Sequence, residues 1–286
     1  MQEIADHVYI EASYPGVLLG AVTWTHGLAL IDAPYRQEDV RSWRASLLNL
    51  GGGVDRLLVN LDANFDRTLG TRLMDCTVVG HEKMAGVFRN RPTTFKSQNY
   101  DTGSEWELGG NLGSIRWAPP EITFTERMDI NWDAFPLSLE YRQGPATGSI
   151  WAHLPDQKLV FVGDAIVSEQ PPFLATADLP SWISNLQDLL KPPYADCAII
   201  SGRSGMISTA QVHTQIAYLQ NVHTLLEEMA ARKAPLDTVE THIPALMKTF
   251  NPVQERHTLY INRLRHGLRQ YYQRHYQPSA GEVLDE

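Results

Sequence analysis

The most constraining feature of the sequence is an apolar strand that runs directly into a polar loop in LLVNLDANFDRTLGTRL, residues 57–73. The apolar run predicts a buried strand. The loop after it places Asp62, Asn64, Asp66 and Arg67 within six positions. A polar cluster of this kind at the end of a strand is the first candidate for a functional site.

The amino-terminal part of the chain predicts a β-rich unit that continues as alternating helices and strands. β-branched and aromatic runs around Pro15 and Gly16 indicate short strands, and glycines end an amphipathic helix that carries Val40, Trp43 and Leu47. The predicted strands lie within residues 7–13, 16–24, 27–34, 56–60 and 76–82, and the predicted helices within 35–52, 67–74 and 82–90.

The second part of the chain predicts further strands and then a helical end. Residues 96–114 are rich in Gly, Ser and Asn, which predicts a loop. From about Thr209 the pattern is helical, with breaks at Pro235 and Pro252. The predicted strands lie within residues 121–130, 136–143, 149–155, 158–164 and 196–202, and the predicted helices within 181–191, 209–232, 236–250 and 252–276.

Length and composition restrict the class of protein. A chain of 286 residues suffices for one main α/β domain with an appendage. The net charge of −9 argues against a general polyanion-binding surface. The sequence shows no apolar run long enough to span a bilayer and no secretory signal at its start, which predicts no membrane association and a cytoplasmic location. Cys76 and Cys197 do not form a disulfide scaffold or a thiolate zinc motif.

Several motifs in order resemble the metallo-β-lactamase fold superfamily. They are GLALIDAP, the loop of residues 61–70 with its TLG, GSIWAHLPDQKLVFVGD, and a strand ending in SGRSG. The resemblance implies an α/β fold, an αββα sandwich, over residues 1–231, with a C-terminal helical extension at 232–286. It also implies one or two metal ions, usually zinc, held by histidines and aspartates, with a metal-bound hydroxide as the nucleophile.

The histidine ligands of the superfamily are missing from the matching positions. The superfamily loop reads Thr-His-x-His-x-Asp-His, and here Asp62 and Asn64 replace the first two histidines, Asp66 retains the aspartate, and Arg67 replaces the last histidine. The next histidine falls within residues 145–147, Pro-Ala-Thr. This chain therefore resembles a divergent member of the superfamily with a degenerate metal site.

The remaining ligand positions follow the same trend. Gly163 and Asp164 match the bridging aspartate, whereas Arg203 lies where the final histidine belongs. The ten histidines include no pair at the spacing of a strand-end loop or of a helical zinc site. A guanidinium cannot bind a cation, but its donors match carboxylates. We therefore expect Arg67 and Arg203 to pair with Asp66 and Asp164.

Two functions from different classes fit this cluster. In the first, the protein lacks the dinuclear zinc hydrolase activity and any cofactor, and binds a small anionic ligand or a partner in the former active-site cleft. Phe65 is expected to form part of the wall of that cleft. In the alternative, a metal-dependent hydrolase holds one divalent ion through the oxygen ligands Asp62, Asn64, Asp66 and Asp164. Whether the chain is an enzyme stays open at this point.

The last predicted helix carries several arginines and tyrosines, which raises the question of nucleic acid. This helix contains a single acid, Glu255, and five arginines: Arg256, Arg263, Arg265, Arg269 and Arg274. Its apolar stripe favours packing against the rest of the protein. The arginines are then expected to pair with acidic residues of this chain or of a second copy. Nucleic acid is thus disfavoured as a partner, and a homo-oligomer remains an open alternative.

Overall fold

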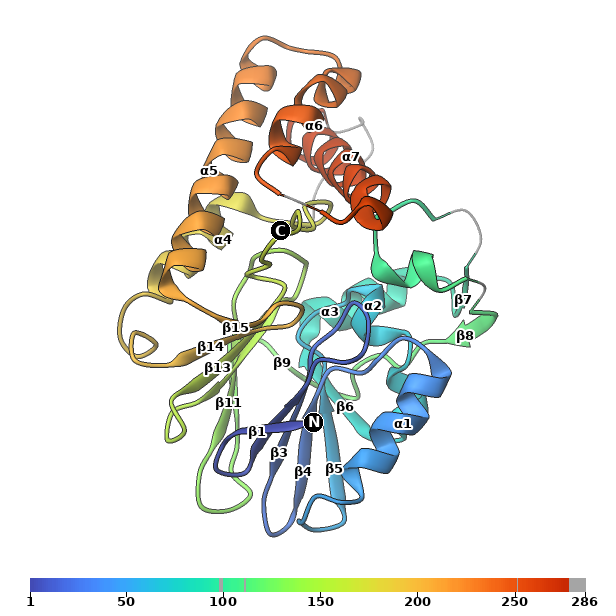
Figure 1. Cartoon of the computed structure of the whole chain (residues 1–286), viewed down its shortest axis with the longest axis vertical. Helices are drawn as coiled ribbons and strands as arrows, with labels where there is room; N and C mark the ends of the chain where they lie inside the picture. The colour runs from blue at the N-terminus through green and yellow to red at the C-terminus, as the bar shows by residue number, and fades with distance from the viewer. Residues whose placement is uncertain (98–99, 111, 251, 278–286) are drawn as a thin grey trace.

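The strands of this computed structural model, which describes residues 1–97, 100–110, 112–250 and 252–277, form two large sheets that pack face to face (Figure 1). The first sheet has the order β1-β2-β3-β4-β5-β6-β9. Its strands are β1 (Gln2–Ala5), β2 (Val8–Glu11), β3 (Leu19–Thr23), β4 (Gly27–Ile31), β5 (Asp55–Val59), β6 (Thr77–His81) and β9 (Ile122–Phe124).

The second sheet has the order β10-β11-β12-β13-β14-β15, and a separate two-stranded ribbon pairs β7 with β8. The strands are β10 (Arg127–Ile130), β11 (Leu137–Tyr141), β12 (Ile150–Leu154), β13 (Leu159–Gly163), β14 (Ala198–Ser201), β15 (Gly205–Ile207), β7 (Thr94–Lys96) and β8 (Ser114–Arg116).

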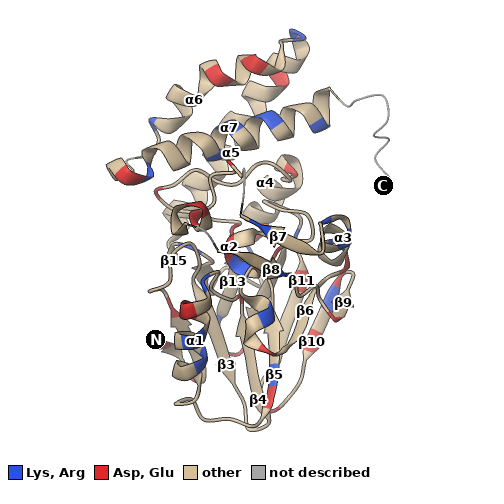
Figure 2. Cartoon of the chain, turned by 90° about the vertical axis from the view of Figure 1, so that its right-hand side faces the viewer, with Lys and Arg blue, Asp and Glu red and all other residues tan. Residues whose placement is uncertain are grey.

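Helices cover the outer faces of the two sheets and the edge where many strands end (Figures 1 and 2). The α-helices are α1 (Gln37–Leu47), α2 (Phe65–Thr68), α3 (Glu82–Asn90), α4 (Leu179–Asp188), α5 (Thr209–Ala231), α6 (Val239–Met247) and α7 (Gln254–Tyr276), and the 3-10 helices are η1 (Thr71–Met74), η2 (Glu105–Gly109) and η3 (Leu236–Thr238).

Apolar side chains fill three layers, which confirms the expected αββα sandwich. Val22, Ile31 and Phe161 belong to the core between the two sheets. Val40 and Trp43 of α1 pack on the outer face of the first sheet. On the outer face of the second sheet, one core includes α4 and α5 together with α6 and α7. The domain boundary at residue 231 coincides with the end of α5 and stays a prediction.

Most predicted elements agree with the structure, and the main exceptions lie in residues 96–114 and 121–130. The strand expected within 121–130 is divided into β9 and β10, which belong to different sheets, and β1 and β15 were not predicted. The helices expected at 209–232, 236–250 and 252–276 are present as α5, α6 and α7 with shorter bounds. The segment expected to be a loop contains η2 and the start of β8. Within the described part of the chain, no helix combines the length and the apolarity needed to cross a membrane.

We predict that α7 is energetically part of the main core. Leu268 of α7 is fully buried, so Leu268→Ala should lower the free energy of unfolding by about 2–5 kcal/mol. Leu48→Ala is the matched control, because Leu48 is 81% exposed and its loss should change stability by less than about 0.5 kcal/mol. Denaturant unfolding of both variants measures the difference. Equal effects would show that α7 does not share this core.

Candidate functional site

Four strands of the two sheets end at the same edge of the molecule and deliver polar side chains there. Asp32 follows β4 and Asp62 lies three residues after β5. Asp164 follows β13, and Arg203 lies two residues after β14. The pairs β4·β5 and β13·β14 are parallel, which is why their carboxyl ends meet. Figure 2 shows acidic and basic residues side by side at this edge, around α2.

The loop after β5 folds because its own side chains satisfy its backbone. The Asp62 carboxylate accepts a hydrogen bond from the Asn64 backbone N–H at 2.8 Å. The Asn64 side chain caps α2 by accepting from the Asp66 backbone N–H at 3.0 Å. The short helix then turns Asp66 and Arg67 into the interior, where both are fully buried.

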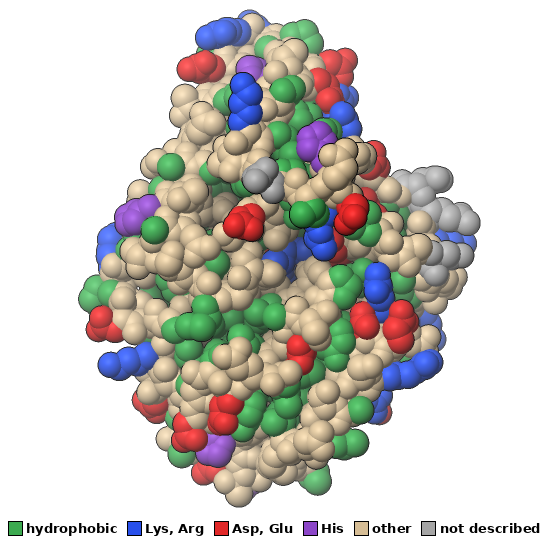
Figure 3. All heavy atoms as spheres, viewed as in Figure 1, with side chains coloured by type: hydrophobic (Ala, Val, Ile, Leu, Met, Phe, Trp, Pro, Cys, Tyr) green, Lys and Arg blue, Asp and Glu red, His purple; other side chains and the backbone are tan. Residues whose placement is uncertain are grey.

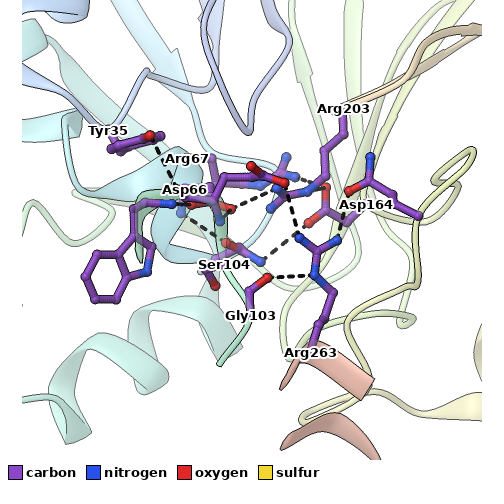
Figure 4. A network of polar contacts seen from close by, with 12 residues as sticks. Tyr35, Asp66, Arg67, Gly103, Ser104, Asp164, Arg203 and Arg263 are labelled. Atoms are coloured by element: carbon purple, nitrogen blue, oxygen red, sulfur yellow. Dashed lines mark hydrogen bonds and ion pairs between the residues drawn. The ribbon is translucent and has the colours of Figure 1, made fainter. Parts of the chain in front are cut away.

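Arg67 is at the centre of this arrangement (Figure 4). Its Nη1 donates to Asp32 Oδ2 at 2.6 Å, and its Nη2 donates to Asp164 Oδ1. Its Nε lies 3.0 Å from Asp62 Oδ1. One guanidinium therefore joins three carboxyl groups that come from three different strand ends.

Arg203 extends the network to a fourth carboxylate. Its Nε donates to Asp164 Oδ1 at 2.9 Å and its Nη1 donates to Asp66 Oδ2 at 2.8 Å. The guanidinium lies 4.6 Å from the ring centre of Phe173. Its Nη2 is buried and has no hydrogen-bond partner within the described part of the chain.

All six candidate residues of the sequence analysis are brought together, and a seventh residue joins them. These seven residues are called the strand-end cluster below: Asp32, Asp62, Asn64, Asp66, Arg67, Asp164 and Arg203.

The expected arginine pairing is present for three of its four contacts. Arg203 pairs with Asp66 and Asp164, and Arg67 pairs with Asp164. An ion pair between Arg67 and Asp66 is not found among the described residues; Arg67 instead contacts Asp32 and Asp62. Sequence reasoning missed Asp32, although an Asp directly after a buried strand was the available signal. Asp32 also has a φ of 60°, a left-handed conformation that Asp tolerates better than most residues.

Glycines at two strand ends beside Arg67 are there for different reasons. A Cβ on Gly202 would lie 2.9 Å from Arg67 Nη1, closer than side-chain atoms normally approach. Gly163 has a φ of +58°, a backbone conformation that favours glycine, while a Cβ there would be in ordinary contact with Arg67. Close packing of the guanidinium therefore depends on the glycine at position 202.

Residues 105–106 and α7 add further contacts around the strand-end cluster. The Asp66 carboxylate accepts hydrogen bonds from the backbone N–H groups of Glu105 at 3.0 Å and Trp106 at 2.8 Å. The buried Glu105 side chain pairs with Arg256 at 2.5 Å and Arg263 at 3.5 Å, both from α7. Two arginines of the last helix thus form ion pairs with an acid of this chain, as the charge pattern predicted.

Burial and neighbouring charges shift the pKa values of the cluster in opposite directions. Burial, together with the nearby Asp164 and Asp32, raises the pKa of Asp62 to about 6 despite Arg67. Burial also raises the pKa of Asp32. Burial opposes ionisation of Asp164 too, but Arg203 and Arg67 outweigh it and lower the pKa of Asp164. Asp164 is therefore ionised, while Asp62 takes up a proton near pH 6.

The cluster does not fit the metal centre that the resemblance implies. Guanidinium nitrogens, which cannot ligate a cation, contact the carboxylates of Asp62, Asp66 and Asp164. A cation placed between these carboxylates would face both positive charges at close range. In residues 1–97, 100–110, 112–250 and 252–277, no group of three or more His, Cys, Asp or Glu side chains could hold a metal ion.

A cavity of about 150 Å³ opens beside the strand-end cluster. Asn64, which donates to Asp164, belongs to both, and the lining residue Phe173 stacks on Arg203 of the cluster. Figure 3 shows one face of the molecule hollowed near its middle, with basic side-chain atoms inside the hollow. The cavity is lined by Ala63, Asn64, Phe65, Val87, Arg91, Thr102, Ser104, Pro145, Ala146, Thr147, Phe173, Ala175, Thr176 and His266.

The lining agrees with one expectation from the sequence, because Phe65 forms part of the cavity wall, as predicted. Residues 145–147, to which the resemblance assigned the position of a superfamily histidine, also line the cavity. Arg91 and His266 were not among the candidate residues, because only the folded chain brings the end of α3 and the middle of α7 to the same cavity.

Comparisons with solved structures agree with this architecture. A metallo-beta-lactamase from Pontibacter korlensis is 19% identical with a TM-score of 0.59, over 77% of this chain and 98% of that chain. The DIM-1 metallo-beta-lactamase is 15% identical with a TM-score of 0.59, over 77% and 96%. This chain therefore has the metallo-β-lactamase fold. Identities this low show the fold alone. No protein-family profile and no curated protein matches the sequence.

We predict that Arg67 is required for stability. Arg67→Met leaves Asp32, Asp62 and Asp164 buried without their shared cation, which should lower the free energy of unfolding by about 3–5 kcal/mol. The control is Arg232→Met, since the Arg232 side chain is 78% exposed and its ion pair with Glu228 should contribute less than about 1 kcal/mol. Denaturant unfolding at pH 7 compares them. A loss in Arg67→Met no larger than the control would contradict this role.

The raised pKa of Asp62 predicts a pH dependence of stability. An unfolded aspartate titrates near 4, so the folded state binds this proton more tightly. The resulting stabilisation is fully present below about pH 4 and is lost as the pH rises through about 6. Asp62→Asn removes this loss, so its Tm relative to the wild type should increase between pH 4 and 7.

Thermal unfolding from pH 4 to 8 measures this difference. Asp156→Asn is the control, because Asp156 is exposed and no ion pair of it is found among the described residues, so its difference from the wild type should stay flat. A Tm difference for Asp62→Asn that is constant or falls with rising pH would show that Asp62 is ionised throughout this range.

Proposed function

We propose that this chain is a metal-independent protein of the metallo-β-lactamase fold that binds a small anionic ligand in the cavity beside the strand-end cluster. The observation that carries the proposal is the position of the two guanidinium groups, which pair with the carboxylates at the strand ends. Most donors of the two guanidinium groups are used within the cluster, while the adjacent cavity is available to a ligand.

The charge around the cavity supports an anion rather than a cation. Of the residues that line it, Arg91 is the charged one, and no Asp or Glu is among them. Arg203 stacks on the lining residue Phe173 and keeps Nη2 without a hydrogen-bond partner in the described residues. A buried donor without a partner is costly, and a ligand acceptor can remove that cost. The proposed role is therefore binding, and hydrolysis through a metal-bound hydroxide is not part of it.

We predict a metal content of less than about a tenth of an equivalent after dialysis against zinc, manganese or magnesium, because an ion would have to displace the arginines. Mass spectrometry on protein purified without a metal column measures it. About one equivalent of a divalent ion that is lost in Asp164→Asn would overturn the proposal and favour the oxygen-ligand hydrolase.

The anion-binding part of the proposal has its own measurement. Calorimetric titration with acetate, benzoate, phosphate and sulfate should detect saturable one-to-one binding of at least one of these ions. Sodium chloride at equal ionic strength is the control for general charge screening. Absence of binding for all four ions would contradict the proposed ligand class.

A further inference from the structure

The Arg91 side chain is a partly buried cation without an acidic partner among the described residues. It follows α3 as the C-cap residue and lines the cavity beside the strand-end cluster. Its Nη2 donates to the Ala63 carbonyl at 2.6 Å. Its Nη1 is buried and has no hydrogen-bond partner in the described part of the chain. The ion pairs found among the described residues do not include Arg91, unlike Arg67 and Arg203.

Aromatic rings hold the guanidinium of Arg91 in place. The guanidinium carbon lies 4.6 Å from the ring centre of Phe65, 4.8 Å from that of Phe88 and 4.6 Å from that of Trp117. Cation–π contacts of this kind stabilise a cation without neutralising it. Burial lowers the pKa of Arg91 to about 10, which still leaves the group charged at neutral pH.

Asp62, the acid whose charge acts on Arg91, is already engaged. The charge of Tyr100 and, less strongly, that of Asp62 oppose the lowering of the Arg91 pKa by burial, but no ion pair between Arg91 and Asp62 is found among the described residues. The Asp62 carboxylate accepts from the Asn64 backbone N–H and faces Arg67 Nε. A ligand acceptor is therefore the partner that would satisfy Nη1 of Arg91.

The rest of the cavity restricts the ligand that could supply this acceptor. Phe65, Val87, Ala146 and Phe173 provide apolar surface, and burial lowers the pKa of His266, so that it is neutral at pH 7. A volume of about 150 Å³ corresponds to one aromatic ring, since an engineered cavity of that size binds benzene. One cation and an apolar wall match a single negative charge on a small apolar body better than a dianion.

We propose that Arg91 binds the carboxylate of a small apolar monocarboxylic acid, with the size of one aromatic ring, whose body rests against Phe65 and Phe173. This inference depends on the proposed function, because it names the ligand class of the same cavity. It assigns the anion to Arg91, which the sequence analysis did not consider, and leaves Arg67 and Arg203 to the strand-end cluster.

The test compares benzoate with its uncharged analogue benzamide, by calorimetric titration at pH 7. Benzoate should bind and benzamide should bind at least about tenfold more weakly, because its neutral carbonyl lacks the negative charge that pairs with the guanidinium. Arg91→Met should weaken benzoate binding by about tenfold or more. Arg89→Met is the control, since Arg89 is exposed on the same helix, and its affinity should stay within about twofold.

A second measurement does not depend on the variants. Phenylglyoxal labels accessible arginines, and peptide mass spectrometry locates the labels. Benzoate should slow the labelling of Arg91 and leave that of Arg89 unchanged.

The contrary outcomes separate this inference from the proposed function. Benzoate binding that survives Arg91→Met, or phosphate or acetate binding without benzoate binding, would overturn the inference and leave anion binding intact. Failure of all tested anions to bind would overturn both.

Discussion

The arrangement of the candidate site depends on one interaction, the contact of the Arg67 guanidinium with three buried carboxyl groups. Asp32, Asp62 and Asp164 come from the ends of three strands in two sheets, and like charges that close would repel without a shared cation. Arg67 balances them from the loop that also positions Asp66. Arg203 then joins Asp66 to Asp164, so that the two sheets are connected through charge at their carboxyl ends.

Metal ions and guanidinium groups can both offset the repulsion between neighbouring carboxylates, but they differ in the chemistry that they allow. Both supply positive charge where carboxylates converge, but a metal ion can also bind and activate water, whereas a guanidinium directs fixed donors to fixed acceptors. In this chain those donors are largely used by the protein itself. The fold is retained, and under the proposed function a ligand would occupy the neighbouring cavity with Phe65, Arg91 and Phe173.

The sequence allowed good prediction of what depends on local pattern. Strand ends are visible as apolar runs that stop at polar residues, and the resemblance to the metallo-β-lactamase superfamily implied that Asp62, Asp66, Asp164 and Arg203 lie together. The contacts between distant segments could not be predicted in this way. Asp32 joins Arg67 across 35 positions, and Arg263 reaches Glu105 across 158. Arg91 was missed for the same reason, because its significance lies in the lack of an acidic neighbour within the described chain, which only the packed structure reveals.

We propose that guanidinium groups occupy the place that the superfamily resemblance assigns to metal ions. A crystal structure of the protein grown with excess zinc, with anomalous diffraction measured at the zinc absorption edge, tests it most directly. We predict guanidinium density from Arg203 between Asp66 and Asp164 and no anomalous peak within bonding distance, about 2.0–2.2 Å, of either carboxylate. A zinc peak bound to both aspartates, with Arg203 turned away, would contradict the account.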